Sequence, residues 1–104
     1  MKPLYIVANV WIEAGRVADF EAYETKAARI MKRYGGQIER TIRPVEGGDA
    51  NTPFEIHVLR FPDQLQFDAF RADDELKALA PERAAVITRS VAVLGIEAPV
   101  YGMD

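Results

Sequence analysis

The stretch that decides the fold is residues 54–62, Phe-Glu-Ile-His-Val-Leu-Arg-Phe-Pro, followed at once by residues 63–70, Asp-Gln-Leu-Gln-Phe-Asp-Ala-Phe. The first segment is rich in β-branched and aromatic residues, and this pattern predicts a strand. Pro62 ends the strand, and the apolar residues after it recur at helical spacing, which predicts a helix. The chain therefore passes directly from a strand into a helix.

The N-terminal part of the chain has the same plan. A strand from Leu4 to Ile12 leads into a helix from Val17 to Tyr34, where apolar residues recur every three or four positions. Gly35-Gly36 ends this helix, because glycine readily adopts the left-handed conformation of a helix C-cap. A strand over 37–45 and a loop rich in turn formers then lead back to the strand at residue 54.

The C-terminal part completes a second strand-helix-strand unit. A helical region interrupted near Asp73-Asp74 and stopped or restarted at Pro81 precedes a last strand over 88–96. The order β-α-β-β-α-β predicts an α+β, ferredoxin-like fold with a four-stranded antiparallel sheet and helices on one face. We expect residues 1–104 to form a single domain, given their number.

The two faces of the first strand differ, because side chains alternate along a strand. One face is aliphatic and is expected under the helices: Ile6, Ala8, Val10 and Ile12. The other face is apolar with polar tips and is expected to be bare, together with Val58 and Leu94: Tyr5, Val7, Asn9 and Trp11. Such a face favours burial against a second copy, so we expect a homodimer with a small-molecule pocket beside the sheet.

Composition narrows the range of partners. The 104 residues carry a net charge of -3 with no basic block, which argues against a nucleic-acid or anionic-membrane surface. The sequence has no cysteine, so disulfides and thiolate chemistry are excluded, and its one histidine lacks metal-ligand spacing. No apolar stretch approaches the length of a membrane span. We expect a cytoplasmic protein with no cofactor and no metal.

Three short motifs carry a family resemblance: Tyr34-Gly35-Gly36, Arg60-Phe61-Pro62, and the run Phe-Arg-Ala-Asp-Asp-Glu-Leu at 70–76 followed by Arg83. Together they resemble the dimeric α/β-barrel superfamily, and their spacing is most similar to family 1330 of the domains of unknown function. That superfamily includes cofactor-free monooxygenases, muconolactone isomerases, aldoxime dehydratases, haem enzymes and proteins without known activity. The resemblance implies a homodimer with a barrel pocket, and it implies no particular reaction.

Candidate catalytic residues are His57, Arg60 and Asn9. His57 suits a general base, since a histidine titrates near neutrality; the alternative is a partly exposed histidine at a sheet end. Arg60 suits a carboxylate or enolate, and its alternative is an ion pair at the strand end. If Phe61 packs under a helix, His57 lies on the helix side, away from a barrel lumen, and Arg60 lies on the opposite face. We favour this arrangement, so Arg60 ranks above His57 as a candidate.

Asn9 and Trp11 form the most unusual pair, because asparagine is depleted in strands. Asn9 suits an oxyanion donor beside a flat wall formed by Trp11, as the resemblance to cofactor-free oxygenases implies. The alternative is an amide paired across a dimer axis, with Trp11 in the interface. Tyr5 and Arg40 are the remaining candidates for binding a substrate.

Two functions follow from these patterns. The first is a homodimer that binds or transforms a small organic acid or aromatic compound in its pocket without a cofactor. The second is a non-catalytic homodimer whose bare sheet face serves only assembly.

Overall fold

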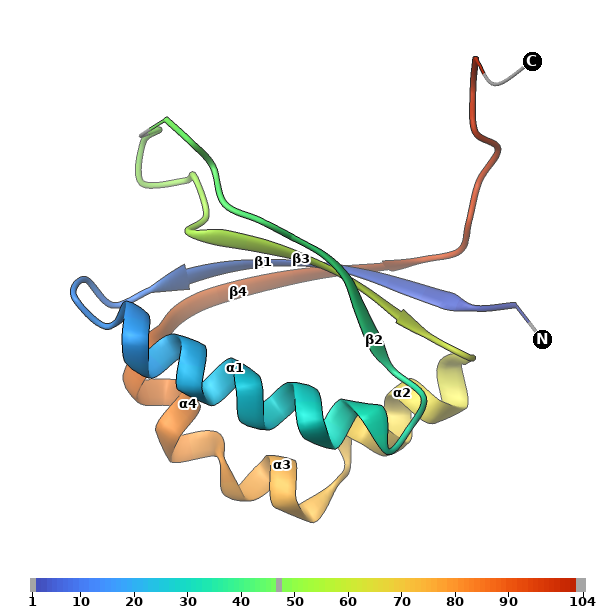
Figure 1. Ribbon diagram of the computed structural model, residues 1–104, viewed down its shortest axis with the longest axis horizontal. Helices are drawn as coiled ribbons and strands as arrows, with labels where there is room; N and C mark the ends of the chain where they lie inside the picture. Colours follow the sequence, from blue (N-terminus) through green and yellow to red (C-terminus); the bar gives the residue numbers. More distant parts are fainter. Residues whose placement is uncertain (1, 47, 103–104) are drawn as a thin grey trace.

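The computed structural model describes residues 2–46 and 48–102 of the chain (Figure 1). In these residues the strands are β1 (Leu4–Ile12), β2 (Gln37–Ile42), β3 (Glu55–Phe61) and β4 (Ile87–Gly95). The helices are α1 (Val17–Lys32) between β1 and β2, and α2 (Gln64–Arg71), α3 (Asp74–Ala78) and α4 (Ala80–Val86) between β3 and β4.

The strands form one antiparallel sheet in the order β2-β3-β1-β4. All the helices lie on one side of this sheet (Figure 1). The predicted ferredoxin-like α+β fold is therefore confirmed. β2 is shorter than the predicted strand over 37–45, and a bulge between Ile38 and Arg40 shifts its register against β3.

The second helical region is broken into pieces by identifiable caps. Asp73 begins α3, since its side chain accepts a hydrogen bond of 3.0 Å from the backbone N–H of Leu76. Pro81 lies in the first turn of α4, where its missing N–H costs no helical hydrogen bond. The interruption near Asp73 and the restart at Pro81 match the sequence prediction.

The hydrophobic core lies between the helices and the aliphatic face of β1. Ile6 of β1, Phe20 and Ile30 of α1, and Phe61 of β3 are almost fully buried. The ring of Phe61 packs at centroid distances of 5.3 Å from Phe67 and 5.5 Å from Phe70, both on α2. The predicted burial of Phe61 under a helix is therefore confirmed.

The Tyr34-Gly35-Gly36 motif has a packing role in this structure. A Cβ atom at Gly36 would lie 2.4 Å from Met31 and 2.6 Å from the Phe61 ring, so only glycine leaves room for that ring. Gly35 has φ +74°, a left-handed conformation that suits glycine. The Tyr34 hydroxyl donates a hydrogen bond of 2.5 Å to Asp73, which ties the end of α1 to the start of α3.

The other face of the sheet is bare of helices (Figure 1). Strand pairing places Val7 opposite Val58 and Val93 there, and Val93 is 60% exposed. The expectation for Leu94 was wrong: it pairs with Ile6, so it lies on the helix side. The alternation along β4 puts Val91 and Val93 on the bare face instead.

Candidate functional site

A cavity of about 310 Å³ lies between the sheet and the helices. Its walls come from β1, β3 and β4 and from all of the helices described above. The lining is mostly apolar and includes Ile6, Leu59, Met31, Phe67 and Phe70. Ser90 and Ala92 of β4 also line it and are exposed, so the cavity opens to the outside along β4.

His57 lies in this apolar wall and is only 6% exposed. The alternation along β3 turns Glu55, His57 and Leu59 toward the helices. His57 Nε2 is 2.5 Å from Oε2 of Glu55, and His57 Nδ1 is 3.8 Å from Oε2 of Glu24 on α1. The imidazole is thus placed between two carboxyl groups.

Glu55 is itself buried and is held from its other side. Arg43 Nε donates a hydrogen bond of 2.7 Å to Glu55 Oε1, and Arg43 Nη2 donates one of 2.8 Å to Glu21. The Arg43 guanidinium also lies 4.7 Å from the ring centroid of Phe54. The charge of Glu55 therefore has partners on both oxygens, as a buried carboxylate requires, and its orientation fixes that of His57.

Glu24 is the polar group best suited to exchange a proton with a cavity ligand. Burial raises the pKa of the Glu24 carboxyl above its usual value of 4.5, and the neighbouring charge of His57 acts in the opposite direction. Burial also raises the pKa of the Tyr23 hydroxyl, against the effect of nearby Arg83. A partly buried carboxyl with a raised pKa beside an imidazole is a common setting for acid–base chemistry.

Arg83 and Ser90 lie at the open side of the cavity. Arg83 on α4 is exposed, lines the cavity, and donates a hydrogen bond of 2.9 Å from Nη2 to the hydroxyl of Ser90 on β4. A guanidinium in this position can bind the carboxylate of an entering ligand. The cavity thus combines a cationic opening, apolar walls and a carboxyl–imidazole pair.

The structure does not bring the six sequence-predicted site residues together. His57 lines the cavity, deep in the sheet rather than partly exposed at its end, so that alternative was wrong. The register places the other five on the opposite, bare side of the sheet: Tyr5, Asn9, Trp11, Arg40 and Arg60. The predicted arrangement of His57 and Arg60 on opposite faces is confirmed.

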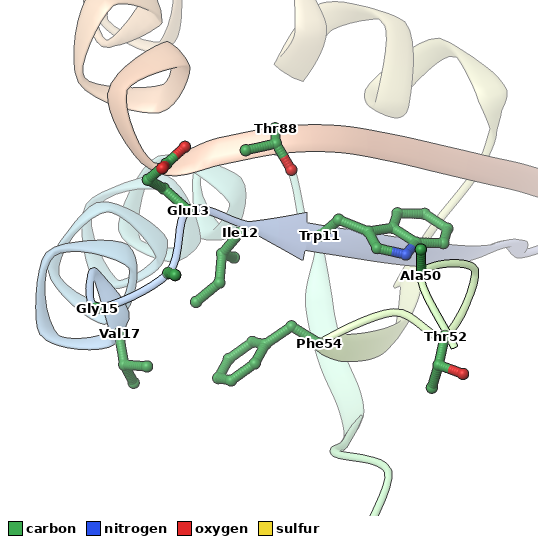
Figure 2. Close-up of a pocket in the computed structure, with 10 residues that line it drawn as sticks. Trp11, Ile12, Glu13, Gly15, Val17, Ala50, Thr52, Phe54 and Thr88 are labelled. Carbon is green, nitrogen blue, oxygen red and sulfur yellow. The ribbon is translucent and has the colours of Figure 1, made fainter. Parts of the chain in front are cut away.

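Asn9 and Trp11 have partners along the bare face. Asn9 Nδ2 donates a hydrogen bond of 3.4 Å to the Val91 carbonyl, and the Arg89 guanidinium lies 4.3 Å from the Trp11 ring centroid. Figure 2 shows Trp11 at a separate surface hollow of about 400 Å³, beside Ala50 and Thr52. This open hollow offers no buried titratable side chain, so it is a weaker candidate for catalysis than the cavity.

Sequence reasoning missed the carboxyl partners of His57. Glu55 lies two residues before His57, and this spacing puts both side chains on one strand face, so Glu55 was within reach of the sequence. Glu24 and Arg83 could not be found from the sequence, because only the packing of α1 and α4 against the sheet brings them to the cavity.

The family is shown by direct comparison. The model of a family described as a domain of unknown function (DUF1330) matches residues 3–96. The chain belongs to DUF1330. No protein with a curated description matches it.

Solved structures share the DUF1330 fold of this chain at low sequence identity. A protein of unknown function from Rhodopseudomonas palustris is 14% identical, with a TM-score of 0.80 over 95% of this chain and 85% of that one. SnoaB, a cofactor-independent oxygenase from Streptomyces nogalater, is 17% identical, with a TM-score of 0.73 over 98% and 99%. A dabb family protein with a ferredoxin-like fold from Mesorhizobium loti is 10% identical, with a TM-score of 0.71 over 95% and 100%. At these identities the likeness shows the fold alone.

Within residues 2–46 and 48–102, no helix has the length and apolar character needed to cross a membrane. In the same residues, no three His, Asp or Glu side chains are grouped as a metal site.

Proposed function

We propose that this DUF1330 chain forms a homodimer and that each copy binds a small organic acid or aromatic compound in the cavity between sheet and helices. There it transfers a proton to or from the ligand without a cofactor. The observation that carries this proposal is the Glu24–His57–Glu55 arrangement, with His57 and Glu55 buried and Glu24 partly buried, which faces a mostly apolar cavity. A buried titratable group in a concave apolar site is the usual mark of a functional site.

The size and lining of the cavity support a small ligand. Its volume of about 310 Å³ is at the low end of ligand pockets. Phe67 and Phe70 offer aromatic surface at one side, and Arg83 offers a positive charge at the opening. A ligand with an aromatic or aliphatic body and one carboxylate satisfies both ends, because the carboxylate pairs with the guanidinium while the body stays in the apolar part.

The proposed proton transfer uses Glu24 and His57 in sequence. The Glu24 carboxyl exchanges a proton with the ligand, and His57 Nδ1, 3.8 Å away, takes or returns that proton once the two side chains close to hydrogen-bond distance. Glu55 holds the imidazole in place, and Arg43 holds Glu55. Deprotonation of an acidic C–H or O–H gives an anion, and such an anion is also the reactive species in a cofactor-free oxidation. The likeness of the fold to that of SnoaB is consistent with this chemistry.

The dimer is supported by the shape of the single chain. Its accessible surface is 7006 Å², whereas a compact monomer of 11.6 kDa exposes about 5,800 Å². Its radius of gyration is 14.7 Å, against about 13 Å for a compact chain of this length. The excess of about 1,200 Å² includes the exposed residues 96–102 as well as the bare sheet face (Figure 1), and it is large enough to hold the roughly 800 Å² that each partner buries in a standard interface. The bare sheet face is the surface that such a dimer would cover.

In this dimer the bare-face candidates lie between the two sheets. Asn9, Trp11, Tyr5, Arg40 and Arg60 then serve either a second ligand contact or the interface itself. Asn9→Ala and Arg60→Ala separate these roles, since an interface role changes the dimer dissociation constant and a ligand role changes ligand affinity at a fixed dimer concentration.

The second candidate function is a non-catalytic homodimer, and the exposed valines of the bare face favour it. It requires assembly and no ligand. The two proposals therefore differ in one measurable property, which is whether small molecules enter the cavity.

A thermal-shift screen with small carboxylates and phenols tests the first proposal. Hits that carry an acidic C–H are then measured by proton–deuterium exchange at that carbon, in wild type and in Glu24→Gln and His57→Gln. Glu39→Gln on β2 is the matched control, since Glu39 does not line the cavity. We expect exchange to fall by at least about 100-fold in the two cavity variants and to persist in the control. Equal exchange in all four proteins would remove the acid–base assignment.

A further inference from the structure

The bare face carries more positive than negative charge. Arg60 of β3, Arg40 of β2 and Arg89 of β4 lie on it by strand register, and no carboxylate occupies a regular ladder position of that face in the described residues. Glu39, at the bulge of the β2 edge, is the carboxylate beside Arg40, since it lines one surface hollow with Gln37, Arg40 and Val58. Two such faces pressed together would bring the remaining like charges into a poorly hydrated space, which is unfavourable unless further carboxylates meet them. An acidic partner from elsewhere in the chain therefore favours a dimer through this face.

Residues 96–102 are the segment that can supply it. This arm follows β4 and extends away from the sheet on its bare side, opposite the helices (Figure 1). Every residue in it is exposed, including the apolar Ile96, Val100 and Tyr101, and Tyr101 is 87% exposed. The arm carries one carboxylate, Glu97. An extended apolar segment with an acidic residue is suited to lie on an apolar face that bears arginines.

We propose that the arm of each copy crosses the bare sheet face of its partner and that Glu97 pairs there with the partner's Arg60, with Arg40 beside it. This inference rests on the homodimer of the proposed function and adds the contact that makes it specific. The partner copy thereby contributes a carboxylate to a face that has none of its own in its regular ladder positions.

The register of the sheet selects Arg60. The arm leaves the sheet at Gly95, and the row across the sheet from Gly95 runs through Tyr5 and Arg60 to Gln37. In the dimer that we propose, the two-fold axis is parallel to the strands. Such an axis keeps these rows of both copies at the same end and places β4 of one copy toward β2 of the other, since β4 and β2 are the two edges. Glu97 then lies near the end that carries Arg60.

Arg89 is less suited to receive Glu97. It lies near the opposite end of β1, where it pairs with Trp11 in register and its guanidinium stacks 4.3 Å from the Trp11 ring centroid. The guanidinium charge of Arg89 is already stabilised by the π face of the Trp11 ring. Arg60 and Arg40 are close neighbours on adjoining strands and form the stronger positive site.

Mixing two charge-reversed variants tests the contact between copies. In a homodimer of Glu97→Lys both contacts join two cations, and in a homodimer of Arg60→Glu both join two anions. A heterodimer of the two variants restores opposite charges at both contacts. We expect each single variant to weaken its homodimer by about tenfold or more, and the equimolar mixture to form heterodimers with near wild-type affinity. Sedimentation and native mass spectrometry measure both.

The control mixture pairs Glu97→Lys with Arg89→Glu, and circular dichroism confirms that each variant is folded. Residue 97 lies outside every helix and strand, so its variant should fold normally. A wild-type dimer that Glu97→Lys leaves unchanged would overturn the arm contact while the dimer stands. Recovery with Arg89→Glu but not with Arg60→Glu would overturn the assignment to Arg60. A monomeric wild type would overturn the dimer itself and the arm contact with it.

Discussion

Replacing Gly36 with alanine tests the packing that fixes the end of α1 against the sheet. The added Cβ would lie 2.4 Å from Met31 Cγ and 2.6 Å from two atoms of the Phe61 ring, whereas ordinary carbon contacts are about 3.5–4.0 Å. The ring would have to move by about 1 Å. That movement would disturb the ring packing, because Phe61 is fully buried against Phe67 and Phe70.

Overpacking of this kind costs about 1–3 kcal/mol. At about 2 kcal/mol, the melting temperature should fall by about 8–16 °C for a domain of this size. Differential scanning calorimetry at one fixed protein concentration measures it. Gly95→Ala is the control, since nothing lies within 4 Å of its added Cβ and its φ is not in the left-handed region. Equal melting temperatures for the two variants would refute the argument that Gly36 makes room for Phe61.

Three further predictions concern charged groups. Glu24→Gln should raise the free energy of unfolding relative to wild type, increasingly as pH rises above about 4.5. The folded-state pKa of Glu24 is raised, so wild type loses stability as pH rises through this pKa and the variant does not. Urea unfolding at several pH values measures the difference. Arg43→Ala should destabilise by about 1–3 kcal/mol in the same assay, since buried Glu55 loses the partner of one oxygen. Tyr34→Phe should reduce stability above pH 3.8 and lose its effect in acid, because the Tyr34 hydroxyl is the main cause that lowers the pKa of Asp73; thermal melts at several pH values compare it with wild type.

Much of the fold could be predicted from local sequence patterns. The alternation in β1 separated its buried and bare faces, and the glycine pair and Pro62 marked the ends of α1 and β3. Strand parity also placed His57 under the helices once Phe61 was assumed to be buried. These inferences succeeded because side-chain direction in a strand depends only on the two-residue period.

The candidate site was predicted only in part, because it depends on how separate elements pack. Glu24 meets His57 only when α1 crosses β3, and Arg83 reaches the opening only because α4 packs beside β4. Leu94 was assigned to the wrong face, since the start and register of β4 against β1 depend on a bulge between Trp11 and Ile12. No local pattern in the sequence fixes such a register.

The most direct test of the account is an NMR titration with benzoate, a small aromatic carboxylate, in wild type and in Ala8→Leu. Ala8 lines the cavity from the centre of the sheet, so a larger side chain should fill part of it; Ala18→Leu on the exposed side of α1 is the control. We expect benzoate shifts at residues such as Glu24, His57 and Phe70 in wild type and in the control, and their loss in Ala8→Leu. Shifts that are confined to the bare face, or that survive the Ala8→Leu substitution, would contradict a ligand site between the sheet and the helices.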